Sequence, residues 1–220
     1  MAIIDSGVAT QHPHVGGVAG GVRILADGED DDYGDRLGHG TAVAGAIRQK
    51  APNAEFLAVR VFDRELTTTA SVLARAIEWA ATHGAQVINV SLGTANAAHA
   101  ERLERAVGVA SEAGALVVAA ASSGGEPVWP GALESVVGVE PEWDVARDVI
   151  RVEDRPNGGL LLRASPYPRP IPGVPPERNL QGVSFAVANA TGFLVRWRES
   201  HDVNGGSPSV ATVRKSLGYW

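Results

Sequence analysis

The sequence predicts an α/β fold with a mostly parallel sheet covered by helices on both faces. Short apolar runs alternate with segments of helical apolar spacing, which is the order of βαβ units. The runs are continuous and rich in valine, isoleucine and alanine, as in strands buried on both sides. The chain of 220 residues is 45% apolar and 20% charged, the balance of a globular protein. Because no linker is visible, we expect a single domain over 1–220.

Each element has its own local signal. The first apolar run ends at the polar turn Asp5-Ser6-Gly7, and two of the helices are closed by Gly84 and Gly114. Strands are predicted at 2–4, 17–25, 56–61, 87–90, 116–120 and 135–139. Helices are predicted at 40–49, 71–83, 98–113, 185–198 and 209–217. Proline and glycine in 140–180 predict short antiparallel strands and turns, with a stiff extended segment at 165–177.

Composition excludes several classes of function. The net charge is -6, from 25 acidic and 19 basic residues, so the basic field of a nucleic-acid-binding protein is absent. Cysteine is absent, which excludes disulfides, thiolate metal sites and a cysteine nucleophile. The longest nearly unbroken apolar run, 113–121, is too short to span a bilayer, and no signal peptide is visible. We expect a cytoplasmic protein with neither a membrane nor a nucleic-acid partner.

Three polar triplets interrupt this apolar scaffold. Asp5 ends a predicted strand, His39 opens a helix in Gly38-His39-Gly40-Thr41, and Ser184 opens the last long helix. The carboxyl ends of parallel strands and the first turns of helices share one crevice, so the three side chains can meet. An acid that orients a histidine, which in turn takes the proton of a serine, is the arrangement of nucleophilic catalysis.

Each triplet also has a structural interpretation. Asp5-Ser6-Gly7 is equally a common turn, and Ser184 is equally a helix N-cap. A small-residue helix does not need His39 at its mouth, so this residue is the hardest to explain by structure alone. The order Asp, His, Ser is more specific than any single member.

These residues resemble the subtilisin family of serine proteases. The similar blocks are 3–8, 38–45 and 182–186, and the similar landmarks between them are 76–80, 87–93 and 117–121. The resemblance covers about residues 2–200 and implies a doubly wound α/β fold. It also implies hydrolysis of a peptide bond through an acyl-enzyme, with Asp5, His39 and Ser184 as the triad and no cofactor or metal.

The resemblance also implies how a peptide binds. Ser91, Leu92 and Gly93 form one wall of the primary pocket and pair with the substrate backbone. Thr68, within 67–69, lies at the second binding edge. Ala121, within 120–122, lines the pocket.

The chain departs from the family pattern around the nucleophile. The family has an asparagine whose side chain donates to the oxyanion, whereas this chain has the shorter Ser123. Loss of such a donor costs on the order of 10²–10³ in rate, although the backbone N–H of Ser184 remains. The family also has Pro and His four and five residues after the nucleophile, where this chain has Ala188 and Asn189. We consider Asn189 as an alternative oxyanion donor.

Other departures concern what surrounds the site. Only four residues precede Asp5, and the family's calcium loop after the His helix is missing, so we expect no pro-segment and no calcium there. A partner protein that supplies the missing N-terminal piece is an alternative. The acidic run Glu29, Asp30, Asp31, Asp32 and Asp35 is interpreted as a solvated loop, as a site for basic substrate side chains or as a calcium loop. His12 and His14 are expected in a polar turn rather than in a metal site.

Three functions are compatible with this pattern. The first is a small protease that removes a leader segment from a specific precursor peptide or small subunit. The second is a pseudoprotease that binds a peptide without cutting it, suggested by Ser123. The third is a transamidating relative, which requires a lid that no long insertion provides.

Overall fold

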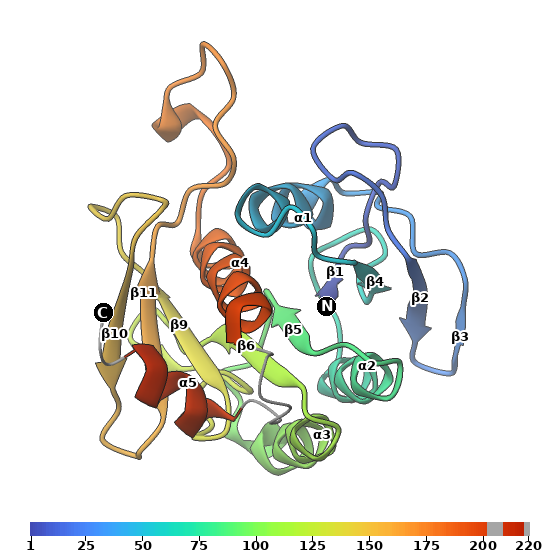
Figure 1. Ribbon diagram of the computed structural model, residues 1–220. Helices are drawn as coiled ribbons and strands as arrows, with labels where there is room; N and C mark the ends of the chain where they lie inside the picture. The colour runs from blue at the N-terminus through green and yellow to red at the C-terminus, as the bar shows by residue number, and fades with distance from the viewer. Residues whose placement is uncertain (202–208, 218–220) are drawn as a thin grey trace.

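The computed structural model describes residues 1–201 and 209–217 and has the predicted α/β architecture (Figure 1). The strands of its main sheet are β1 (Ala2–Asp5), β2 (Gly20–Leu25), β3 (Gly28–Asp30), β4 (Leu57–Arg60), β5 (Val87–Val90), β6 (Leu116–Ala120), β9 (Val137–Pro141), β10 (Ile150–Asp154) and β11 (Leu160–Ala164). They form one nine-stranded sheet in the order β10-β11-β9-β6-β5-β1-β4-β2-β3. Pairing is parallel except at the two edges, where β3 and β10 run antiparallel. The fold class predicted from sequence is therefore confirmed.

Helices cover both faces of the sheet. On one face lie α1 (His39–Lys50) and α4 (Val183–His201), and on the other lie α2 (Ala70–Thr82) and α3 (Ala100–Glu112) (Figure 1). Adjacent residues of β1 point to opposite faces, so Ile3 enters the core under α1 and α4, whereas Ile4 enters the core under α2 and α3. This alternation explains why the strands are apolar without a break.

The helices match the predicted ones closely, with small shifts at their ends. Thr69 caps α2, since its Oγ accepts the N–H of Val72 at 3.2 Å, and Gly84 follows the helix with a φ of 79°. The last long helix starts at Val183, two residues before the predicted start, so that Ser184 lies within its first turn. A short α5 (Val210–Leu217) packs on β11 through the buried Val213. None of the helices in residues 1–201 and 209–217 combines the length and apolar character needed to cross a membrane.

The proline-rich region differs from its prediction in one respect. β10 and β11 form the expected antiparallel pair, but β11 also pairs in parallel with β9, with Leu160 opposite Val137. The predicted antiparallel strands are thus present, and the parallel pairing of β11 is an addition that the sequence did not predict. The physical reason is burial, because alternate side chains of β11 enter the core under α4 and draw this strand into the main sheet.

Residues 166–182 form an arm that projects from the body just before α4 (Figure 1). They include most of the predicted extended segment and a short 3₁₀ helix, η2 (Pro176–Arg178). The Gly182 N–H donates to the Pro166 carbonyl at 2.9 Å and closes the base of the arm. The arm therefore leaves and re-enters the body at one place, immediately ahead of Ser184.

Candidate active site

Asp5 is the last residue of β1, and its side chain is fully buried. Its Oδ1 accepts the Ser6 N–H at 2.7 Å and lies 2.7 Å from Nδ1 of His39. Within the described residues, Oδ2 has no hydrogen-bond partner. Asp5 and His39, predicted to act together, are thus in direct contact although 34 residues separate them in sequence.

His39 is the first residue of α1 and remains partly accessible. Burial opposes its charged form, but the hydrogen bond to Asp5 and the negative charges of Asp5 and Asp35 outweigh burial and raise the pKa of His39 above its ordinary value. Because Nδ1 faces Asp5, Nε2 is the nitrogen left to exchange a proton with a substrate or a nucleophile.

Gly40 permits the close approach of α1 to the end of β1. A Cβ at this position would lie 2.1 Å from the carbonyl oxygen of Gly7 and 3.1 Å from Cβ of Asp5. The helix that carries His39 therefore reaches Asp5 only because its second residue has no side chain.

Ser184 lies at the same end of the sheet as the Asp5–His39 pair. Its Oγ donates to the carbonyl of Ser91, just beyond the carboxyl end of β5, at 3.3 Å. The ring of Phe185, the next residue, lies 5.6 Å from the His39 ring. Across residues 1–201 and 209–217, no hydrogen bond joins Ser184 to His39. The structure thus brings the three predicted residues to one edge, with the serine hydroxyl turned to Ser91.

The first turn of α4 leaves a backbone donor beside this hydroxyl. The N–H groups of Phe185 and Ala186 both point to the Gly182 carbonyl, at 3.0 and 3.4 Å. The N–H of Ser184 has no acceptor among the described residues. A free N–H at a helix N-terminus, together with the helix dipole, favours negative charge at this position.

Asp35 is the organising carboxylate of the loop that precedes α1. Its Oδ1 accepts from Ser6 Oγ and from the N–H groups of Leu37 and Gly38, at 2.8 to 2.9 Å. Its Oδ2 accepts both the N–H and the hydroxyl of Thr41, at 2.9 and 2.5 Å. Burial favours the neutral acid, but these hydrogen bonds outweigh it and hold the pKa of Asp35 below its usual range.

Ser6 extends the Asp35 network to the end of β1. Its Oγ donates to Asp35 and accepts the N–H of Gly40 at 2.9 Å. Asp35 therefore fixes both the residue after Asp5 and the residues on either side of His39. Sequence alone placed Asp35 in an acidic run, where only its position four residues before His39 hinted at this role.

The remaining carboxylates of the acidic run have partners or face solvent. Asp30 pairs with Arg23, and Asp32 pairs with Arg36 at 2.6 Å and with the buried Arg60 at 3.1 Å. No group of three or more potential ligands in the described part of the chain is arranged to hold a metal ion. The interpretation of this run as a calcium loop therefore lacks support from the described residues, whereas a site for basic substrate side chains stays a prediction, since Glu29 and Asp31 are exposed.

Four of the five predicted peptide-binding residues lie beside Ser184 or line one small cavity. Thr68, Leu92 and Gly93 line a cavity of about 200 Å³ between the segment before α2 and the segment after β5. Ser91, next to them, accepts the Ser184 hydroxyl. Ala121 is buried at the end of β6, where its carbonyl accepts the Val128 N–H at 3.0 Å.

The two candidate oxyanion residues lie in different environments. Ser123 is exposed in a two-stranded hairpin of β7 (Ser122–Ser123) and β8 (Glu126–Pro127). Asn189 is only 1% exposed, and its amide nitrogen donates to the carbonyls of Ser165 and Tyr167 at 2.8 and 3.0 Å. Both amide hydrogens are engaged, so the alternative of Asn189 as an oxyanion donor is wrong. Its role is to anchor the chain entering the arm.

Sequence reasoning missed Asn89, which connects the site to α4. Its amide nitrogen donates to Ser91 Oγ at 2.8 Å, and its oxygen accepts the Thr191 hydroxyl at 3.0 Å. The signal was a polar residue inside a buried apolar strand, which needs a hydrogen-bond partner there. Asn89 thereby fixes the segment after β5 relative to the helix that carries Ser184.

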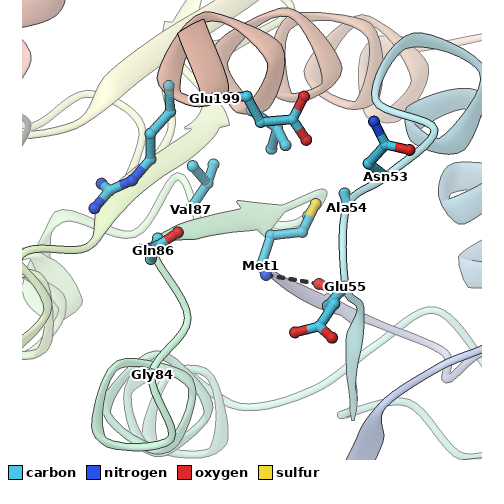
Figure 2. A pocket seen from close by; sticks show the side chains of 10 residues that line it. Met1, Asn53, Ala54, Glu55, Gly84, Gln86, Val87 and Glu199 are labelled. Carbon is cyan, nitrogen blue, oxygen red and sulfur yellow. Dashed lines mark hydrogen bonds between the residues drawn. The ribbon is translucent and has the colours of Figure 1, made fainter. Parts of the chain in front are cut away.

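A second cavity lies elsewhere. It measures about 390 Å³ and is lined by Met1, Glu55, Gln86 and Arg198, among others, at the amino ends of β1, β4 and β5 (Figure 2). The Met1 ammonium group donates to the Glu55 carbonyl at 2.8 Å. This cavity is at the sheet edge opposite the one that holds Asp5, His39 and Ser184.

Comparisons with known proteins agree with this geometry. A model of the subtilase family matches residues 1–140, a range that holds Asp5 and His39 and ends before Ser184. A thermophilic serine proteinase from Bacillus sp. (strain AK1) is 41% identical over 155 residues. Those residues are 63% of this chain and 37% of that protein, so the chain spans little more than a third of that relative's length.

Solved structures share the whole fold. The prenylagaramide maturation protease PagA superposes with a TM-score of 0.67 at 25% identity, covering 98% of this chain and 81% of that one. A lanthipeptide protease superposes with a TM-score of 0.69 at 21% identity, covering 97% and 77% of the two chains.

Proposed function

The chain belongs to the subtilase family, and on that premise we propose that it is a serine endopeptidase with Asp5, His39 and Ser184 as its catalytic triad, in a single peptidase domain over 1–220. The observation that carries this proposal is the 2.7 Å contact between Asp5 Oδ1 and His39 Nδ1 at the sheet edge where Ser184 opens α4.

The proposed reaction starts with proton transfer. The Ser184 side chain turns from the Ser91 carbonyl toward His39, and Nε2 takes the hydroxyl proton as Oγ attacks the peptide carbonyl. Asp5 stabilises the imidazolium that forms. The C–N bond then breaks, His39 gives the proton to the leaving amine, and Ser184 holds the acyl group as an ester. Water, deprotonated by His39, attacks the ester, and His39 returns the proton to Ser184.

We propose two donors for the oxyanion. The free N–H of Ser184 is the first, because it lies at the helix N-terminus beside the attacking oxygen. Ser123 is the second, at the position where the family has an asparagine. Its exposed place in the hairpin suits a donor that becomes positioned only when a peptide covers it.

We propose that the peptide binds between two segments. Ser91, Leu92 and Gly93 pair with its backbone on one side, Thr68 borders the other side, and Ala121 lines the space beyond. The cavity of about 200 Å³ beside Thr68 is formed partly by Leu66, Leu73 and Leu92. It suits an apolar substrate side chain upstream of the cleaved bond.

We propose a precursor peptide or small protein as the substrate, from which the enzyme removes a leader in the cytoplasm. Two structural relatives support this class, since one is a maturation protease for prenylagaramide and the other is a lanthipeptide protease. A partner protein that completes the fold or site stays a further proposal.

A peptide-binding pseudoprotease is the second candidate. The observation that favours it is the hydrogen bond of Ser184 to Ser91 in place of one to His39. A fluorophosphonate probe distinguishes the two candidates, because it labels only a serine activated by its base.

The expected result is label on Ser184, identified by mass spectrometry and absent in Ser184→Ala. His39→Ala should slow labelling about 10²–10⁴-fold, the usual contribution of a general base. Ser111→Ala, at an exposed position in α3, is the matched control and should label like the wild type. An unlabelled wild type, with and without a candidate precursor peptide, would favour the pseudoprotease.

A further inference from the structure

A loop segment separates the carboxyl ends of two neighbouring strands near Ser184. β5 and β6 pair in parallel up to Val90 and Ala119, and residues 128–131 then enter between the two chains. Trp129 exchanges two hydrogen bonds of 2.9 Å with Thr94, on the β5 side. On the β6 side, the Val128 N–H donates to the Ala121 carbonyl at 3.0 Å. The segment is thus tied to both strands.

The side chain of Val128 occupies the space between the two strand ends. A Cβ on Gly93 would lie 2.4 Å from Cγ1 of Val128, so the valine methyl packs directly against the Gly93 backbone. Val128 is 7% exposed. Its backbone contacts Ala121 while its side chain contacts Gly93, so this one residue spans the gap.

This gap is where a substrate side chain next to the cleaved bond has to enter. Ser91 lies 3.3 Å from the Ser184 hydroxyl, which places the reacting carbonyl beside the segment after β5. The side chain on the acyl side of that carbonyl then points between Gly93 and Ala121, toward Val128.

We propose that Val128 closes this pocket and restricts the residue on the amino side of the cleaved bond to glycine, alanine or serine. The inference rests on the proposed function and adds to it the substrate class. A leucine or phenylalanine at this substrate position has to displace Val128, which is held at its backbone and packed on Gly93. Overpacking of such a space is unfavourable because the surrounding atoms have to shift.

The test uses peptidyl phosphonates that differ only in the side chain next to phosphorus: that of alanine, leucine or phenylalanine. Labelling rates of Ser184 are measured for the wild type, Val128→Ala and Val128→Gly. Val149→Ala, an exposed valine at 44% accessibility, is the matched control. A simple alkyl fluorophosphonate, which needs no side-chain pocket, reports on the triad alone.

The wild type should react with the alanine probe on the order of 100-fold faster than with the phenylalanine probe. Val128→Gly should raise the rate of the phenylalanine probe at least about 10-fold, Val128→Ala should raise that of the leucine probe, and Val149→Ala should change neither. If a Val128 variant fails to fold, the ratio of the wild type's labelling rates with the alanine and phenylalanine probes tests the inference by itself.

Two outcomes overturn the inference in distinguishable ways. Equal rates for alanine and phenylalanine probes, with normal alkyl fluorophosphonate labelling, would refute the closed pocket and leave the protease proposal intact. Folded Val128 variants with the same ratio of labelling rates as the wild type would also refute the closed pocket and leave the protease proposal intact. Failure of the alkyl probe itself on the wild type would remove the protease proposal and the pocket with it.

Discussion

Replacement of Asp35 by asparagine tests how the site is held together. The carboxylate accepts five hydrogen bonds, from Ser6, Leu37 and Gly38 on Oδ1 and twice from Thr41 on Oδ2. Asparagine has nearly the same shape but only one accepting oxygen. In the better orientation, the amide oxygen keeps the three bonds of Oδ1, and the NH₂ group faces the Thr41 N–H. In the remaining hydrogen bonds, the acceptor also changes from a charged carboxylate to a neutral amide oxygen.

The expected cost follows from these losses. A part-buried donor without an acceptor costs about 1–3 kcal/mol, and hydrogen bonds to a charged acceptor exceed neutral ones by about 1 kcal/mol. We therefore expect Asp35→Asn to lower the free energy of unfolding by roughly 2–4 kcal/mol at pH 7. Because the pKa of Asp35 is lowered in the folded state, its contribution is present above the unfolded pKa and is lost as the pH falls through the folded pKa.

Urea unfolding measures this cost, and Asp31→Asn provides the matched control. Asp31 belongs to the same acidic run, is exposed, and its side chain has no hydrogen bond within the described residues. Asp31→Asn should therefore change stability by less than about 0.5 kcal/mol. Equal effects of the two substitutions would show that Asp35 does not organise the loop.

The same variant should also change catalysis. The negative charge of Asp35 helps to raise the pKa of His39, and only the neutral imidazole acts as a base. In Asp35→Asn, the acidic limb of the rate of Ser184 labelling should move to lower pH. An unshifted limb would contradict the electrostatic part of the reasoning.

Three further predictions concern other contacts. Gly40→Ala should abolish labelling of Ser184 and destabilise the fold, because the new Cβ would clash with the Gly7 carbonyl. Its control is Gly108→Ala in α3, where a Cβ meets no atom within 4 Å. This control should raise the stability measured by thermal unfolding by about 0.5–1 kcal/mol. Asn189→Ala should cost about 2–4 kcal/mol, because it leaves the Ser165 carbonyl without the Asn189 donor and the Tyr167 carbonyl with the Arg147 guanidinium in place of two donors. Proteolysis of the arm is a second readout, and normal protection of the arm would contradict the anchor. Since the pKa of His39 is raised, its contribution to stability is full below the unfolded pKa and is lost as the pH rises through the folded pKa. His39→Gln should remove this pH-dependent loss of stability, measured by unfolding between pH 6 and 9. An unchanged dependence of stability on pH would refute this contribution of His39.

Local chemistry in the sequence was sufficient for most elements. The helix predicted at 71–83 is observed as α2 (Ala70–Thr82), because Thr69 supplies a cap and Gly84 adopts the positive φ that ends it. The buried strands follow from continuous apolar runs. The candidate site residues Asp5, His39 and Ser184 are predicted from polar residues at strand ends and helix starts, which a parallel sheet brings to one edge.

Contacts between distant segments required the tertiary structure. Asp35 belongs to an acidic run in which Asp30 and Asp32 form ion pairs, and only its position four residues before His39 hinted at its role. Its hydrogen bond with Ser6, 29 residues away, required the tertiary structure. Asn189 differs from the family's histidine, but its carbonyl partners lie 22 and 24 residues away. Such roles depend on which distant segments of the chain come into contact, and the spacing of residues along the sequence does not show this.

The sequence by itself determined the α/β class, the order of most helices and strands and the residues that meet at the edge of the sheet, because backbone propensity, burial and capping act within a few residues. Only the tertiary structure decided that β11 joins the sheet in parallel, that Asp35 ties the loop of His39 to Ser6 at the end of β1, and that Val128 lies between Gly93 and Ala121. Each of these depends on packing and hydrogen bonds between segments that approach only after the chain has folded.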